Sequence, residues 1–255
     1  MANTTPIVQS PKAQARISPI TDPSDLPRFF DITASAFGSQ TKDGLWIANN
    51  PSWDTVKGRE SAIARLTERW KSTTINRNGG PNTVFLQATV TDEDTGTETV
   101  AGVAIWVQLS MLEGYGDKPV ADLSKAIDLD ALYPGDEGEQ DYLCQIDYSL
   151  HRRRIQVIQE IASSSSPAVF ALDLCAVDPA FQRRGVANAL VQWGLDEARR
   201  RGGLEAVTEA SSMGRRVYMK MGFQQEGGEI VYNVDRRFTD RDRPSNVFLR
   251  TGRPA

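Results

Sequence analysis

The spacing of apolar positions along the chain predicts both helices and strands. Apolar residues recur at helical spacing over residues 26–37 and 58–71, as expected for helices with one buried face. Residues 83–90 and 97–107 are rich in β-branched side chains and flank an acidic turn that contains a glycine, so they predict an antiparallel hairpin. Residues 16–20 form a further candidate strand, whose proline suits the edge of a sheet.

The last third of the chain alternates strands with helices. The expected elements are a strand at residues 169–177, a helix at 183–201, a strand at 204–210, a short helix at 212–221 and strands at 229–234 and 246–250. Two consecutive glycines, Gly202 and Gly203, end the long helix. This order of elements predicts an α/β (α+β) domain in which helices cover a sheet.

The stretch from about residue 110 to residue 166 has the weakest pattern. Its middle, residues 128–141, is acidic, and the apolar positions of residues 143–161 indicate a helix. We interpret this stretch as an insertion in a single domain that covers residues 16–255. Residues 1–15 are polar and without pattern, as in a disordered tail.

Composition limits the classes of function. The 255 residues include 29 Lys and Arg against 33 Asp and Glu, a net charge of −4, so the basic field of a nucleic-acid-binding protein is missing. The two cysteines, Cys144 and Cys175, exclude a disulfide framework and a four-thiolate zinc site. The single histidine, His151, makes histidine-based metal sites and Ser-His-Asp chemistry poor candidates, and no metal is expected. The basic run 151–154 is expected on a solvated helix face.

The sequence indicates neither a targeting segment nor a membrane span. Residues 1–10 lack the apolar core of a signal peptide, and the longest apolar run, residues 100–107, is too short for a bilayer. We therefore expect a cytoplasmic protein without a membrane partner, either a monomer or a homodimer.

The most informative segment joins the expected strand at residues 169–177 to the long helix. A strand that enters a tight turn and then a helix leaves free backbone N–H groups at the helix start, where the helix dipole adds positive potential. Such a turn binds an anionic phosphate. Gly185 allows a ligand to approach the backbone, and Arg183 and Arg184 add positive charge. The alternative is a turn whose glycine serves only the change of direction.

The residues of this turn match a family pattern. Gln182-x-x-Gly185-x-Ala187, directly after a strand, resembles the signature of the GNAT superfamily of acyl-CoA N-acyltransferases. Further along, residues 218–223 have the sequence Tyr-x-x-x-Gly-Phe, which resembles the end of that family's domain. Residues 209–211 are similar to a GNAT branch common in filamentous fungi. Two motifs in the right order favour the family over a plain turn.

This resemblance implies a fold and a co-substrate. The fold is a mixed sheet of six to seven strands, flanked by helices, whose central parallel strands, 169–177 and 204–210, splay apart and admit acetyl-CoA. Its pantetheine would pair with the backbone edge of Cys175, Ala176 and Val177. Its pyrophosphate would lie on the turn and helix start, formed by Gln182, Arg183, Arg184, Gly185, Val186 and Ala187.

The resemblance also implies roles in acetyl transfer. It places the general acid at Tyr218, which protonates the departing thiolate, and an oxyanion donor at the backbone N–H of Val177. The amine must lose a proton before it attacks. Asp173 and Glu209 are the candidate bases, because a carboxylate in a central strand is costly to bury without a task or a partner. A structural salt bridge is the alternative for each.

The sequence thus predicts an N-acetyltransferase. It would transfer the acetyl group of acetyl-CoA to a primary amine of a small molecule, by direct attack in a ternary complex without a covalent enzyme intermediate. A non-catalytic acyl-CoA-binding regulatory module and the acetylation of a protein or peptide amine are the alternatives.

Overall fold

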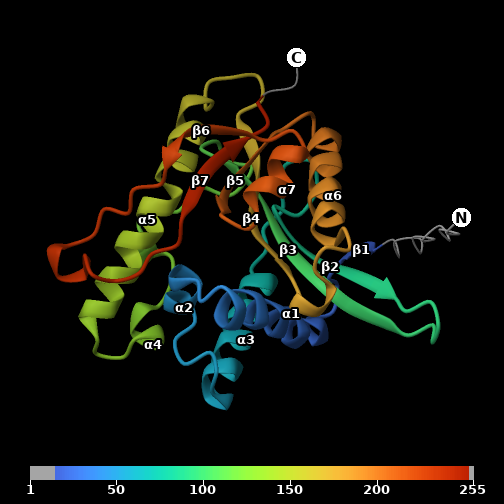
Figure 1. The fold of residues 1–255 in the computed structure, drawn as a ribbon. Coiled ribbons are helices and arrows are strands. Elements are labelled where there is room, and N and C mark those ends of the chain that lie inside the picture. Colours follow the sequence, from blue (N-terminus) through green and yellow to red (C-terminus); the bar gives the residue numbers. More distant parts are fainter. Residues whose placement is uncertain (1–14, 253–255) are drawn as a thin grey trace, which may run out of the picture.

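The computed structural model describes residues 15–252, which build a seven-stranded sheet in the order β1-β2-β3-β4-β5-β7-β6 (Figure 1). The strands are β1 (Arg16–Pro19), β2 (Thr83–Thr91), β3 (Glu98–Ser110), β4 (Ala168–Val177), β5 (Glu205–Ser211), β6 (Gln224–Glu229) and β7 (Asn246–Arg250). β4 and β5 are parallel, and the other neighbouring strands are antiparallel. The predicted mixed sheet is confirmed. Of the expected tail, residues 1–14 lie outside the described residues.

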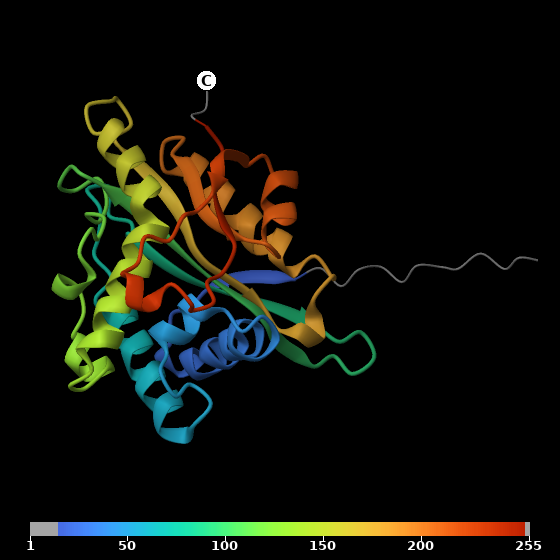
Figure 2. The same ribbon diagram turned by 60° about the vertical axis from the view of Figure 1, so that its left-hand side comes forward.

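Helices cover both faces of this sheet (Figure 1 and Figure 2). They are α1 (Leu26–Thr33) with a π-helical continuation (Ala34–Gln40), α2 (Gly44–Asn49), α3 (Val56–Lys71), α4 (Leu129–Leu132), α5 (Glu137–Glu160), α6 (Val186–Arg200) and α7 (Arg215–Lys220), with short 3-10 turns between them. α6 and α7 pack on one face, and α1, α3 and α5 pack on the other. None of the helices within residues 15–252 is long and apolar enough to cross a membrane.

Each face of the sheet has its own apolar core. Under α6, the fully buried Trp106 stacks on Phe170 with ring centroids 5.1 Å apart. Gly194 of α6 lies directly above Trp106, where a Cβ atom would come within 2.0 Å of the indole ring. The absence of a side chain at Gly194 therefore lets the middle of α6 lie close to β3.

The two central parallel strands separate part-way along their length. β4 and β5 are paired from Val169 and Glu205 to Leu172 and Thr208. Beyond that pair, β4 stays on β3 as far as Val177, and β5 stays on β7, while no further pairing joins β4 to β5 in the described part of the chain. The expected splay is confirmed, and it leaves one edge of β4 without a neighbouring strand.

A β-bulge at Asp173 changes the faces of β4. Trp106 on β3 is paired with Leu172, but its neighbour Ile105 is paired with Leu174, so Asp173 is the extra residue. Strict alternation predicts that Val169, Asp173 and Cys175 share one face. That prediction is wrong for Cys175, because the bulge turns it to the face of α6 while Val169 packs toward α1.

Two predicted element boundaries are also wrong. The helix expected from residue 183 begins at Val186, because Arg183 and Gly185 have φ angles of 64° and 88°, outside the helical region. The strand expected at residues 229–234 lies earlier, at Gln224–Glu229. That strand is polar and exposed at the sheet edge, so it is defined by backbone pairing with β7 and not by a hydrophobic pattern.

Candidate active site

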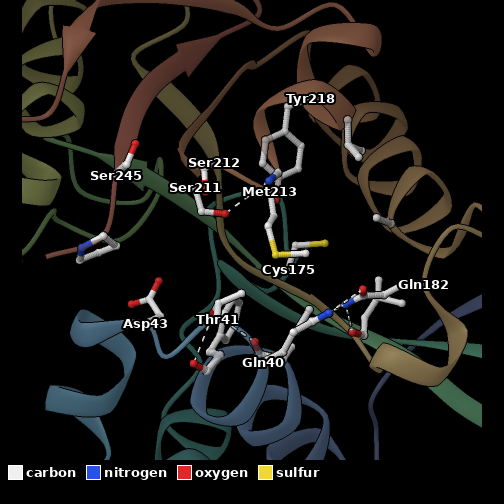
Figure 3. A pocket seen from close by; sticks show the side chains of 18 of the residues that line it. Gln40, Thr41, Asp43, Cys175, Gln182, Ser211, Ser212, Met213, Tyr218 and Ser245 are labelled. Atoms are coloured by element: carbon white, nitrogen blue, oxygen red, sulfur yellow. Dashed lines mark hydrogen bonds between the residues drawn. The ribbon is translucent and has the colours of Figure 1, made fainter. Parts of the chain in front are cut away.

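A cavity of about 640 Å³ lies where β4 and β5 separate (Figure 3). Its walls come from the segment before α2, the open edge of β4, the turn into α6, the segment from β5 to α7 and the loop before β7: residues 36, 37, 40–44, 175–177, 182, 183, 185–188, 211–214, 217, 218 and 242–245. In Figure 3, Gln40 and Gln182 lie toward one end, Asp43 toward the other, and Cys175 and Tyr218 lie between them. One cavity thus joins the expected phosphate-binding turn to the expected general acid.

The turn into α6 is open toward this cavity. Gly185 is the N-cap residue of α6 with a φ of 88°, and within the described residues no side chain caps the helix start. The first N–H groups of α6 are therefore open to an anionic ligand, and the helix dipole favours one. A Cβ atom on Gly185 would meet no described atom within 4 Å. This open space at Gly185 is compatible with a phosphate against the backbone, and the binding of a phosphate by residues 185–187 stays a prediction.

Gln182 holds the turn in place. Its side-chain amide donates to the carbonyl oxygen of Val177 at 3.2 Å, and it is hydrogen-bonded in both directions to the amide of Gln40, at 2.7 and 3.0 Å. Gln182 therefore ties the end of β4 to the π-helical segment on the opposite wall.

The two arginines of the turn differ in their surroundings. Arg183 lines the cavity. Arg184 instead lies over the ring of Phe181, with 5.2 Å from its guanidinium carbon to the ring centroid, and it is not among the described residues of the cavity wall. The structure thus supplies one arginine of the pair to the wall of the cavity.

The edge of β4 at Cys175, Ala176 and Val177 lines the cavity. The N–H of Asp178 donates to the carbonyl of Ala101, on the β3 side, at 2.9 Å. Since backbone groups of a strand alternate in direction, the N–H of Val177 is directed to the open edge. This is the position that the family pattern assigns to an oxyanion donor.

Tyr218 reaches the middle of the cavity from α7. Its hydroxyl lies near the thiol of Cys175, and its ring lies so close to Gly214 that a Cβ atom there would come within 2.6 Å of it. Burial raises the pKa of Tyr218 well above its usual value and that of the Cys175 thiol to about 12. Tyr218 is therefore a neutral proton donor, and Cys175 is a thiol and not a thiolate.

The two predicted bases lie outside the cavity wall. Asp173 accepts hydrogen bonds from Arg154 and Arg69, each at 2.7 Å, and Glu209 is bound by the same Arg154. Burial disfavours the charge of Asp173, but the guanidinium groups of Arg69 and Arg154 outweigh it and hold the pKa of Asp173 well below its usual range. Neither carboxylate is among the described residues that line the cavity. Their role as base stays a prediction.

A carboxylate that the sequence analysis missed does line the cavity. Asp43 precedes α2 and caps it by accepting the N–H of Trp46 at 2.9 Å. Burial raises the pKa of Asp43. The only signal in the sequence is an aspartate before a short helix, which marks a cap but does not show that the segment faces β4.

The family model described as Acetyltransferase (GNAT) family matches residues 149–223. The match includes β4, the turn into α6 and Tyr218. Together with the splayed seven-stranded sheet, it identifies a GNAT acetyltransferase domain, and the predicted resemblance is confirmed. No curated protein matches the sequence.

Solved structures share this fold at low sequence identity. Arylalkylamine N-acetyltransferase 2 from Aedes aegypti is 18% identical with a TM-score of 0.58, over 92% of this chain and 97% of that one. Polyamine N-acetyltransferase from Drosophila melanogaster is 11% identical with a TM-score of 0.56, over 93% and 97%. A protein from Corynebacterium glutamicum described as histone acetyltransferase HPA2 and related acetyltransferase is 18% identical with a TM-score of 0.50, over 94% and 97%.

Proposed function

We propose that this N-acetyltransferase transfers the acetyl group of acetyl-CoA to a primary amine of a small molecule, by direct attack in a ternary complex. The observation that carries the proposal is the cavity that joins the start of α6, the open edge of β4 and Tyr218 to a carboxylate at its far end. A phosphate cradle at one end and an acidic group at the other suit an anionic donor and a cationic acceptor.

In this proposal each group of cavity residues has a separate role in acyl transfer. The N–H groups at the start of α6 and Arg183 hold the pyrophosphate, and the edge of β4 pairs with pantetheine. The N–H of Val177 donates to the oxygen of the thioester carbonyl as negative charge develops on it. As the C–N bond forms and the C–S bond breaks, Tyr218 donates its proton to the departing sulfur. The nitrogen releases a proton to solvent, and Tyr218 takes one up from solvent. Because Cys175 remains a thiol, no acyl-enzyme step is included.

Asp43 is the carboxylate that we place next to the acceptor. It lines the cavity at the end away from Gln182 (Figure 3), where a charge-assisted hydrogen bond would orient an ammonium group. The size of the cavity supports a small acceptor, since small-molecule sites measure roughly 300–1,000 Å³. The similarly folded insect proteins are an arylalkylamine and a polyamine N-acetyltransferase, which also favours a small amine.

The release of free thiol from acetyl-CoA tests this proposal directly. The purified protein is mixed with acetyl-CoA and a panel of arylalkylamines, polyamines and lysine-containing peptides. We expect amine-dependent thiol release with small amines. Release with peptides alone favours a protein acceptor, and coenzyme binding without release favours a regulatory module. The cytoplasmic location and the monomeric or homodimeric state stay predictions.

A further inference from the structure

An arginine of the insertion helix lies at the point where the central strands separate. Arg154 comes from α5, and its side chain is only 6% exposed. Its Nη1 donates to Asp173 of β4 at 2.7 Å, its Nε donates to Glu209 of β5 at 3.0 Å, and its Nη2 also contacts Glu209. One guanidinium group therefore binds both strands. The expectation that the basic run 151–154 faces solvent is wrong for Arg154.

Arg154 lies directly beyond the last residue pair that joins β4 to β5. Leu172 and Thr208 form the last pair of β4 and β5, and the hydroxyl of Thr208 donates to the carbonyl of Leu172 at 2.9 Å. The next residue on each strand is a carboxylate, Asp173 or Glu209. Two adjacent buried carboxylates repel each other when nothing neutralises them. Arg154 offsets this repulsion where backbone pairing stops.

We propose that Arg154 is a positioning residue that sets the separation of β4 and β5, and with it the width of the acetyl-CoA cleft. This inference rests on the proposed placement of coenzyme A at the edge of β4. The proposed role of Arg154 gives the insertion a function in the reaction. The insertion contains α5, which lies between β3 and β4 in the sequence, and Arg154 of α5 links β4 to β5. Asp173 and Glu209 then serve as its two anchors.

The shape of the guanidinium group explains why an arginine is required. Its planar donors can form hydrogen bonds in two directions at fixed angles, whereas lysine offers a compact point charge on a flexible stem. Lysine at residue 154 would preserve the charge but would not hold both strands at one separation. The conservative substitution therefore does not rescue the positioning.

The test uses three changes in the full-length protein. Arg154→Lys keeps the positive charge. Arg154→Met combined with Asp173→Asn and Glu209→Gln removes the three charges together, so that no buried carboxylate is left without a partner and the fold is retained. Arg153→Gln is the matched control. Arg153 lies on the same helix but pairs with Glu160 and Glu226, and not with Asp173 or Glu209 at the point where β4 and β5 separate.

Two measurements are made on the folded fraction of each variant: amide hydrogen exchange in β4 and β5, and the dissociation constant of coenzyme A by calorimetry. We expect faster exchange in both strands and a dissociation constant raised about tenfold or more in Arg154→Lys and in the triple variant, with Arg153→Gln like wild type. A merely structural role would lower the melting temperature without changing the dissociation constant of the folded protein.

Unchanged exchange and unchanged coenzyme affinity in both Arg154 variants would overturn the inference. Two further single variants, Asp173→Asn and Glu209→Gln, are assayed for turnover and for coenzyme affinity. A large loss of turnover at unchanged coenzyme affinity would also overturn the inference, because that pattern belongs to a base. A wild-type protein without affinity for coenzyme A refutes the proposed function instead, and the exchange measurement then still decides whether Arg154 positions the strands.

Discussion

At the scale of single residues, the protonation states of the cavity side chains determine the chemistry. Tyr218 and Cys175 lie near each other and are both kept neutral by burial, so the tyrosine can give a proton to a leaving thiolate while the cysteine is a poor nucleophile. Asp43 is a half-buried carboxylate that lines the cavity. The proposed proton donor and the proposed recognition group thus lie on different walls of one cavity.

Tyr218→Phe removes the proposed acid and keeps the ring that packs against Phe223. We expect turnover to fall by about 100-fold or more, the usual contribution of a general acid, with little change in the affinity for coenzyme A. Steady-state thiol release and calorimetry measure the two quantities. Turnover equal to that of the wild type would refute the assignment.

Asp43→Asn removes a charge but keeps an N-cap, since asparagine caps helices as well as aspartate does. At neutral pH we expect kcat/KM for a cationic amine to fall on the order of 10-fold. Because burial raises the pKa of Asp43, the wild-type carboxylate takes up its proton at a higher pH than usual. The advantage of wild type over the variant should therefore shrink as the pH is lowered through that pKa. A ratio that does not change with pH contradicts the assignment.

At the scale of elements, the sequence predicts the contiguous parts of the site well. The strand, turn and helix around Gly185 and the short helix of Tyr218 follow from local pattern and motif, and the structure has them. The bulge at Asp173 was missed because a period of two assumes an unbroken ladder. The strand β6 was misplaced because its polar sequence has no buried face.

Gly185→Glu tests the role of the α6 start, with Gly96→Glu as its control. Both glycines have a positive φ and open space around them. A side chain at either position therefore lowers the free energy of unfolding by a similar amount, about 1–2 kcal/mol. Gly96 lies in the turn between β2 and β3, away from the cavity. We expect calorimetry to show loss of coenzyme A binding only in Gly185→Glu, where a carboxylate occupies the phosphate cradle. Equal binding in the two variants contradicts this placement.

At the scale of the whole molecule, the site is assembled from segments far apart in the sequence. Gln40 and Asp43 lie between β1 and β2 in the sequence, Arg154 comes from the insertion, and the loop at residues 242–245 comes from near the end of the chain. Such groups meet only through tertiary packing, so sequence reasoning identified the turn into α6 and Tyr218, which line the cavity, but missed Asp43 and mistook Arg154 for a surface residue.

The arrangement of both substrates in one cavity predicts sequential kinetics. Initial velocities measured at several concentrations of amine and acetyl-CoA should give intersecting lines in double-reciprocal plots, since the buried Cys175 thiol, with its pKa raised to about 12, forms no acyl-enzyme. Cys175→Ala should retain that pattern. Parallel lines in wild type that are lost in Cys175→Ala would instead show a covalent intermediate.

The central claim is that the space between the separated ends of β4 and β5 holds coenzyme A. The most direct measurement is a crystal structure of the protein with coenzyme A bound. We predict the pyrophosphate on the backbone N–H groups of residues 185–187 and the pantetheine along residues 175–177. A coenzyme bound at another surface, with this space left open, would contradict the account.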